Sequence, residues 1–159
     1  MSICQDYGKI LEKKQGGIMD GYILPFKPAK NIRRENAPFH KTSKRMENCV
    51  DFRMPQGTPI LAIADGVVKS VETRFSKNYE DPKYAMRCNF IRIEHENGDN
   101  SHYVHIAWRS ARVRTGQKVK QGQVIAKSGM TGYSTYPHLH FGLYDKNGKN
   151  IKPKFSNRP

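Results

Sequence analysis

Apolar residues occur in short runs separated by Gly, Pro and Asn, and many of these runs alternate apolar with polar positions. A period of two is typical of a β-strand that buries one face. We interpret the runs at 59–64, 66–71, 90–95, 102–107, 119, 124–127 and 139–144 as strands. No segment shows a long helical period, so the pattern predicts an all-β protein.

The chain has 159 residues, a length that suits one domain with its own core. Residues 1–20 are polar and predict an N-terminal arm, 21–150 contain the patterned domain, and 151–159 form a basic C-terminal tail. The segment 74–88 is long for a hairpin loop and carries Phe75, Tyr79 and Tyr84. It either lines a groove or forms a lid that packs on itself.

The segment around His138 and His140 carries the strongest chemical signal. In a strand these two imidazoles share one face, whereas Leu139 and Phe141 take the other. Imidazole is the commonest protein ligand of zinc, so the pair is a candidate metal site. The alternative is a chance pair on a solvated strand.

A metal needs further ligands, and Asp51 is a candidate because it stands between apolar Val50 and Phe52. The alternative role for Asp51 is a strand-end residue or turn cap. A further histidine cluster lies in a predicted hairpin around Gly98. There, odd spacing puts His102 and His105 on opposite faces, and we expect His105 to face a cleft together with Tyr103.

Three ordered motifs give the chain a family resemblance. They are Val50-Asp51-Phe52 followed by Pro55 and Gly57-Thr58-Pro59, then Tyr103-Val104-His105, and finally Gly129-Met-Thr131-Gly-Tyr-Ser134 with Pro137-His-Leu-His-Phe141. In these residues the chain resembles the lysostaphin-like zinc metallopeptidases, which are bacterial cell-wall endopeptidases. The resemblance extends from about residue 22 to 144. It implies an antiparallel β-sheet core with a substrate groove.

The resemblance also implies roles for individual residues. Asp51 and His140 correspond to zinc ligands, and His105 and His138 to catalytic histidines that do not bind the metal. Compact members carry a histidine ligand four residues before the aspartate, where this chain has Glu47.

Longer members have their histidine ligand well upstream of the aspartate, after a Y-x-L-P-F opening. This chain has that opening at Tyr22-Ile-Leu-Pro-Phe26, so we expect His40 to be the third ligand. Glu47 and Cys49 remain alternative ligands through a carboxylate or a thiolate. The alternative role for His40 is an exposed loop histidine among basic residues.

The implied ligand set has a chemical rationale. Three protein ligands leave zinc an open position, which distinguishes a catalytic site from a closed structural one. Water at such a site has a pKa of about 7. Of His105 and His138, one would take the proton of the water, and the other would stabilise the oxyanion or protonate the leaving amine.

Charge indicates the kind of partner. Lys and Arg number 28 against 14 Asp and Glu, which gives a net charge of +14. Such a surface attracts polyanions, including the anionic polymers of bacterial envelopes. No nucleic-acid-binding motif accompanies the charge, so we expect no specific nucleic acid.

The sequence contains no apolar segment long enough to be a transmembrane helix and no visible signal peptide. Three cysteines (Cys4, Cys49 and Cys88) without paired spacing favour reduced thiols. Peptidoglycan as substrate implies the periplasm, the cell wall or the extracellular space, and we expect a monomer.

Two functions follow: a zinc endopeptidase that cleaves peptide cross-links of peptidoglycan, or a non-catalytic relative that binds the wall or regulates other hydrolases. Asp51, His105, His138 and His140 all match the family motifs, which favours the enzyme.

Overall fold

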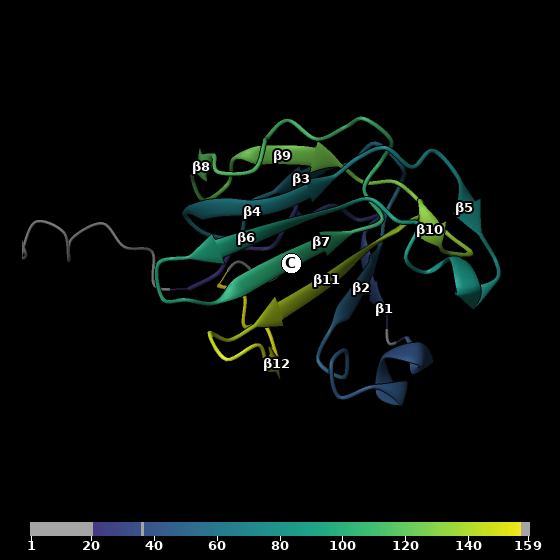
Figure 1. The fold of residues 1–159 in the computed structure, drawn as a ribbon, viewed down its shortest axis with the longest axis horizontal. Helices are drawn as coiled ribbons and strands as arrows, with labels where there is room; N and C mark the ends of the chain where they lie inside the picture. The colour runs from purple at the N-terminus through teal and green to yellow at the C-terminus, as the bar shows by residue number, and fades with distance from the viewer. Residues whose placement is uncertain (1–20, 36, 157–159) are drawn as a thin grey trace, which may run out of the picture.

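The computed structural model describes residues 21–35 and 37–156, which form a β protein (Figure 1). No α-helix occurs in this described part of the chain. The strands are β1 (Arg33–Glu35), β2 (Val50–Arg53), β3 (Pro59–Leu61), β4 (Gly66–Glu72), β5 (Asn78–Tyr79), β6 (Phe90–His95), β7 (Asn100–Val104), β8 (Lys118–Val119), β9 (Val124–Lys127), β10 (Gly132–Tyr133), β11 (His138–Tyr144) and β12 (Asn150–Ile151), and the 3₁₀ helices are η1 (Pro38–Thr42) and η2 (Pro82–Tyr84).

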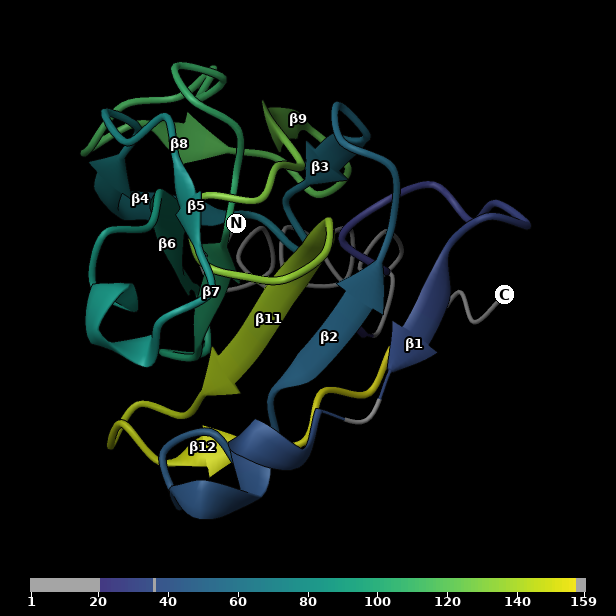
Figure 2. The ribbon, with the colours of Figure 1, turned by 90° about the vertical axis from the view of Figure 1, so that its right-hand side faces the viewer.

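One large sheet dominates the fold, and its strand order is β1-β2-β11-β7-β6-β4-β8. β12 extends it by pairing with β11. Every pairing in this sheet is antiparallel, which confirms the fold class expected from the sequence. β3 pairs with β9 in a small antiparallel sheet, and β5 pairs with β10 in a small parallel one. Figure 2 shows β11, β2 and β1 side by side at one end of the large sheet.

The core lies on one face of the large sheet. β6 and β7 alternate buried and less buried residues, as their sequence pattern predicts. Ile91, Ile93, Tyr103 and Phe141 all point into this core and have no exposed surface. The Tyr103 hydroxyl accepts a hydrogen bond of 3.0 Å from the backbone of Ile63, so its polar end is satisfied there. The opposite face of the same strands is left for polar side chains.

The predicted hairpin around Gly98 is present between β6 and β7. Gly98 has φ 86°, a value that a residue without Cβ adopts readily, and its N–H donates to the carbonyl of His95. β7 is shorter than expected because the predicted strand at 102–107 stops at Val104. His105 has φ 65°, which no extended strand can accommodate.

The segment 74–88 packs partly on itself and partly on β10. Tyr79 stacks on Tyr84 with ring centroids 4.2 Å apart, and β5 pairs with β10. β5, η2 and β10 form a lobe at the right of Figure 1. Asn89 secures the start of this segment, because its side chain bonds both the N–H and the carbonyl of Phe75.

The predicted C-terminal tail is attached to the domain over residues 151–156. Ile151 belongs to β12, and Phe155 contacts the rings of Phe52 and Phe141. The predicted arm at 1–20, with Cys4, lies outside the described residues. Cys49 and Cys88 are free thiols. No helix in the described ranges has the length and apolar character needed to cross a membrane.

Candidate metal centre

Asp51 is held in the middle of β2 with its carboxylate on the polar face of the large sheet. Its neighbours Val50 and Phe52 point into the core, with exposed fractions of 2% and 4%. Asp51 itself is only 4% exposed, although it carries a charge. A buried carboxylate requires strong polar partners, and the partners here are histidines.

His138 and His140 lie on the same face of β11, as the spacing of two predicts. β11 runs antiparallel to β2, and this register places His140 opposite Asp51 and His138 opposite Arg53. The Nδ1 atom of His140 is 3.0 Å from Oδ1 of Asp51. The Nε2 atom of His138 is 3.8 Å from Oδ2 of the same carboxylate.

His40 reaches the same point from η1, which lies near the start of β2 (Figure 2). It is 6% exposed, so the alternative of a solvated loop histidine does not describe it. Its Nδ1 atom lies 3.1 Å from the carbonyl of Cys49 and must donate, because a carbonyl only accepts. Its Nε2 atom points toward the strands and is 3.2 Å from Asp51 Oδ1 and 3.0 Å from His140 Nδ1.

Three potential ligand atoms thus converge from η1, β2 and β11. One atom each from His40, Asp51 and His140 lies within 4.8 Å of the others, and this group can hold a metal ion. Both His40 and Asp51 are buried, whereas the His140 side chain keeps 16% exposure. The group therefore has an opening toward solvent at His140.

The two alternative ligands stand elsewhere. Glu47 is exposed and is not part of this group. Cys49 is buried, and its Sγ atom lies 3.6 Å from the Tyr144 hydroxyl and 3.7 Å from Nδ2 of Asn150. Cys49 also raises the pKa of His140, so its thiol acts on a member of the group from outside.

Gly142 makes room for this arrangement. A Cβ at Gly142 would lie 3.1 Å from Cys49 Sγ and 2.8 Å from the Tyr144 ring. A glycine therefore suits the position after Phe141, because the Cys49 thiol and the Tyr144 ring occupy the space that a side chain would need.

His105 enters the site by a route that strand alternation does not predict. The expectation that it shares a cleft with Tyr103 is wrong, because Tyr103 is fully buried in the core. Instead, the positive φ of His105 turns its side chain toward His138, with ring centroids 4.6 Å apart. Backbone strain of this kind is often found at functional sites.

Backbone carbonyls orient both of these histidines. Nδ1 of His105 is 2.6 Å from the carbonyl of Thr131, and Nδ1 of His138 is 2.9 Å from the carbonyl of Tyr136. Each Nδ1 must therefore donate, which leaves each Nε2 unprotonated in the neutral ring. The Ser134 hydroxyl also lies 3.2 Å from Nδ1 of His138.

Sequence pattern alone assigns no role to these positioning residues. Thr131 and Ser134 were present in the recognised motif, but only as parts of its pattern. The contribution of Thr131 is made by a backbone oxygen, whose direction no residue type reveals. Its hydroxyl accepts from the Asn89 N–H and donates to the Ile106 carbonyl, which fixes the segment.

Burial and charge set the protonation states. Burial, helped by the charges of His138 and His140, lowers the pKa of His105 to about 3. Burial also lowers the pKa of His138, against the opposing charge of Asp51. Both rings are therefore neutral near pH 7.

The pKa values of Asp51 and His140 shift in opposite directions. Burial alone would raise the pKa of Asp51, but hydrogen bonds from His140 and His40 hold it well below its usual range. Burial alone would lower the pKa of His140, but hydrogen bonds to Asp51 and Cys49 raise it to about 9. Asp51 is thus an anion throughout the neutral range, which suits a metal ligand.

Comparison with known proteins agrees with this geometry. The family model described as peptidase family M23 matches residues 45–153. The chain belongs to peptidase family M23. The matched residues include Asp51, His105, His138 and His140, whereas His40 precedes them.

Two known proteins illustrate the similarity in sequence and fold. The chain is 40% identical over 106 residues to the peptidoglycan DD-endopeptidase ShyA of Vibrio cholerae, covering 65% of this chain and 22% of that protein. It superposes on the lysostaphin catalytic domain of Staphylococcus simulans with a TM-score of 0.52 and 30% identity, covering 84% and 85% of the two chains.

A second similar structure is described as a zinc-containing peptidase from Vibrio cholerae. Its TM-score is 0.60 at 28% identity, and the match covers 87% of this chain and 41% of that one. The chain spans about a quarter of the length of the curated relatives that it matches.

Proposed function

We propose that this M23 domain is a zinc-dependent endopeptidase that hydrolyses peptide cross-links of bacterial peptidoglycan. One observation carries the proposal: His40, Asp51 and His140 converge beside two neutral histidines whose Nε2 atoms are unprotonated. A metal centre with adjacent bases is the arrangement that metal-assisted hydrolysis requires.

The donor set fits zinc. Two imidazole nitrogens and one carboxylate oxygen are typical ligands of a catalytic zinc ion. Ligand atoms of a tetrahedral zinc ion are about 3.3 Å apart at normal bond lengths. The three atoms here are separated by 3.0, 3.0 and 3.2 Å, so little movement is needed to accept the ion.

The surroundings of the three ligands also suit zinc. Nδ1 of His40 donates to the Cys49 carbonyl, which is the usual partner arrangement of a metal-bound histidine. When bound, zinc supplies Lewis-acid chemistry: it acidifies water and polarises a peptide carbonyl. The opening at His140 leaves space for water and substrate.

His105 and His138 supply proton transfer. Each ring is neutral, is fixed by a carbonyl at Nδ1 and offers a lone pair at Nε2. Such a nitrogen can accept the proton of the attacking water. The imidazolium formed in this way is acidic, so it returns the proton to the departing amine.

The substrate class is supported by the relatives. ShyA is described as a peptidoglycan DD-endopeptidase, and ALE-1 of Staphylococcus capitis, 40% identical over 92 residues, as a glycyl-glycine endopeptidase. Both names specify cleavage of peptide bonds, and the first specifies peptidoglycan. The net charge of +14 also suits an anionic polymer.

Digestion of purified sacculi tests the proposal. The zinc-loaded protein should release soluble fragments with new amino termini, a chelator should stop the release, and added zinc should restore it. His138→Ala, loaded with zinc, is the matched inactive control. If the zinc-loaded protein binds sacculi without releasing fragments, it is instead a non-catalytic wall-binding or regulatory module.

A further inference from the structure

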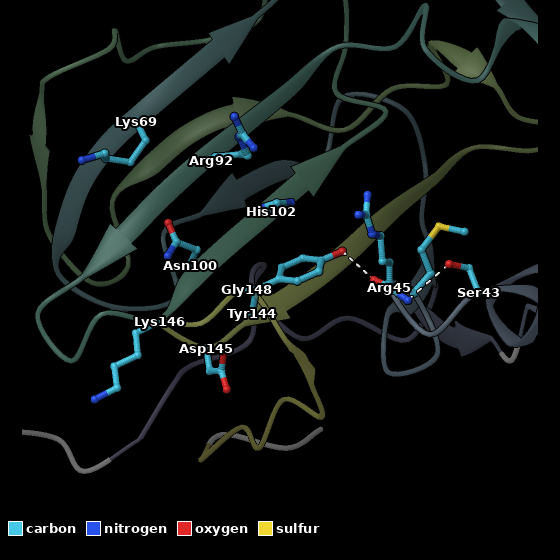
Figure 3. A pocket seen from close by; sticks show the side chains of 11 residues that line it. Ser43, Arg45, Lys69, Arg92, Asn100, His102, Tyr144, Asp145, Lys146 and Gly148 are labelled. Carbon is cyan, nitrogen blue, oxygen red and sulfur yellow. Dashed lines mark hydrogen bonds between the residues drawn. The ribbon is translucent and has the colours of Figure 1, made fainter.

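A cleft of 740 Å³ lies on the polar face of the large sheet (Figure 3). It is floored by side chains from β4, β6, β7 and β11 and bordered by the 43–46 segment and the turn after β11. His102 and Tyr144 pack against each other in it, with ring centroids 4.4 Å apart and the ring planes tilted by 35°. In the view of Figure 3, His102 lies between Arg92 and Arg45.

The lining of the cleft is strongly basic. It contains four cationic side chains, those of Arg45, Lys69, Arg92 and Lys146, against one acidic side chain, that of Asp145. The exposed positions of all four cationic residues leave their charged groups accessible to a ligand. The cleft therefore has an excess of three positive charges at pH 7.

Only part of this charge is neutralised within the protein. Lys69 has one ion pair, with Glu94 at 3.5 Å, and Arg92 donates from Nε to the neutral Ser70 hydroxyl at 2.9 Å. Within residues 21–35 and 37–156, Arg45 and Lys146 form no ion pair.

Asp145 is occupied elsewhere, because its Oδ1 atom accepts hydrogen bonds from the backbone of Asn147 and Lys149. It therefore caps the turn rather than pairing with the cleft cations. The guanidinium groups of Arg45 and Arg92 are left available for an external anion.

The cleft adjoins the metal centre. Tyr144 is four residues from His140 on the same face of β11, which corresponds to about 13 Å along a strand. The Tyr144 hydroxyl donates to the Arg45 carbonyl on one side and lies beside Cys49 Sγ on the other. One tyrosine thus separates the basic cleft from the metal site.

We propose that the cleft binds a carboxylate of the peptidoglycan peptide whose cross-link is cut at the metal centre. The inference rests on the proposed function and names a subsite of the substrate. An extended peptide covers 13 Å with about four residues, so the bound carboxylate belongs to the peptide region next to the cleaved bond. The planar forks of Arg45 and Arg92 match a carboxylate in two-point geometry.

Binding of an uncrosslinked stem tests this subsite without requiring catalysis. The probe is a purified disaccharide tetrapeptide, compared by calorimetry with the same compound whose carboxylates are amidated. The full-length zinc-loaded protein should bind the free-acid probe about tenfold more tightly, as expected when charge-assisted hydrogen bonds are lost on amidation. Arg45→Gln combined with Arg92→Gln should remove this preference and leave affinity for the amidated probe unchanged.

A matched variant controls for net charge. Lys118→Gln with Lys127→Gln removes two exposed charges from β8 and β9, outside the cleft lining, and should keep the tenfold preference. An equal loss of the free-acid preference in both double variants would overturn the inference, because it would indicate a general charge effect. Tighter, Arg45- and Arg92-dependent binding of a short poly(glycerol phosphate) would also overturn it in favour of a wall phosphate polymer.

The failure of this inference is distinguishable from failure of the proposed function. Hydrolysis of cross-linked muropeptides is measured on the same preparations. Normal hydrolysis with no preference for the free-acid stem would contradict the carboxylate subsite and still support the endopeptidase. A carboxylate preference without hydrolysis retains the subsite as a binding site but removes the endopeptidase.

Discussion

Asp51 and His140 stand opposite each other on the antiparallel strands β2 and β11, with Asp51 Oδ1 3.0 Å from His140 Nδ1. Strand register alone sets this pairing, because a slip of one residue would move either side chain to the core face. His40 is added from outside the sheet, by η1. The candidate metal centre therefore combines two rigid positions with one that depends on a short connecting segment.

The first prediction concerns the ligand from that segment. His40→Ala should lower zinc affinity by at least about a hundredfold, since loss of a direct ligand exceeds the usual effect of an outer residue. Glu47→Ala should change affinity little, because Glu47 is exposed and outside the group. Competition with a chromophoric chelator measures both values. The reverse ranking would assign the ligand role to Glu47.

The second prediction separates metal binding from proton transfer. His105→Ala and His138→Ala should each retain about one zinc ion per chain and lose about 10²- to 10⁴-fold in turnover, the usual contribution of a general acid or base. Metal content and cleavage of a soluble cross-linked peptide are measured on the same samples. Loss of zinc in either variant would place that histidine among the ligands.

The third prediction concerns Cys49, which raises the pKa of His140 from outside the ligand group. Cys49→Ala should lower zinc affinity about tenfold, because residues that orient a ligand typically contribute 10- to 100-fold. Cys49→Ser, which keeps a polar group, should recover part of that loss. Complete loss of zinc in Cys49→Ser with His40→Ala unaffected would instead indicate a thiolate ligand.

The fourth prediction concerns acid stability and His102. Burial, followed by the charges of Arg92 and His140, lowers the pKa of His102 from 6.5 to about 4. The unfolded chain therefore binds this proton more tightly than the folded protein. The resulting stabilisation is fully present above pH 6.5 and is lost as the pH falls toward 4.

His102→Gln should reduce this acid sensitivity by up to about 3 kcal/mol in the free energy of unfolding. Urea unfolding of both proteins at pH 7 and pH 4.5 measures the effect. An identical loss of stability in both proteins would show that His102 does not contribute to it.

Much of this architecture follows from local sequence pattern. The alternation in β6 and in β11 identified the strands and put His138 and His140 on one face, because a period of two is a property of the backbone alone. Asp51 stood out because a charge lay between two apolar residues. Such signals need no knowledge of distant contacts.

Other features of the site depend on tertiary structure. The approach of His105 depends on a positive φ, and alternation instead paired it with the buried Tyr103. The carbonyl of Thr131 orients His105 through the backbone, which leaves no mark in residue type. The proximity of His40 to Asp51 requires the turn after η1 to fold back, so only family resemblance suggested it.

X-ray absorption at the zinc edge tests the central claim most directly. The claim is that His40, Asp51 and His140 hold the ion. The zinc-loaded protein should contain about one zinc per chain, with nitrogen and oxygen neighbours at about 2.0–2.1 Å and no sulfur neighbour at about 2.3 Å. His140→Ala should abolish stoichiometric binding. A sulfur neighbour, or a wild-type chain that stays metal-free after loading, would contradict the account.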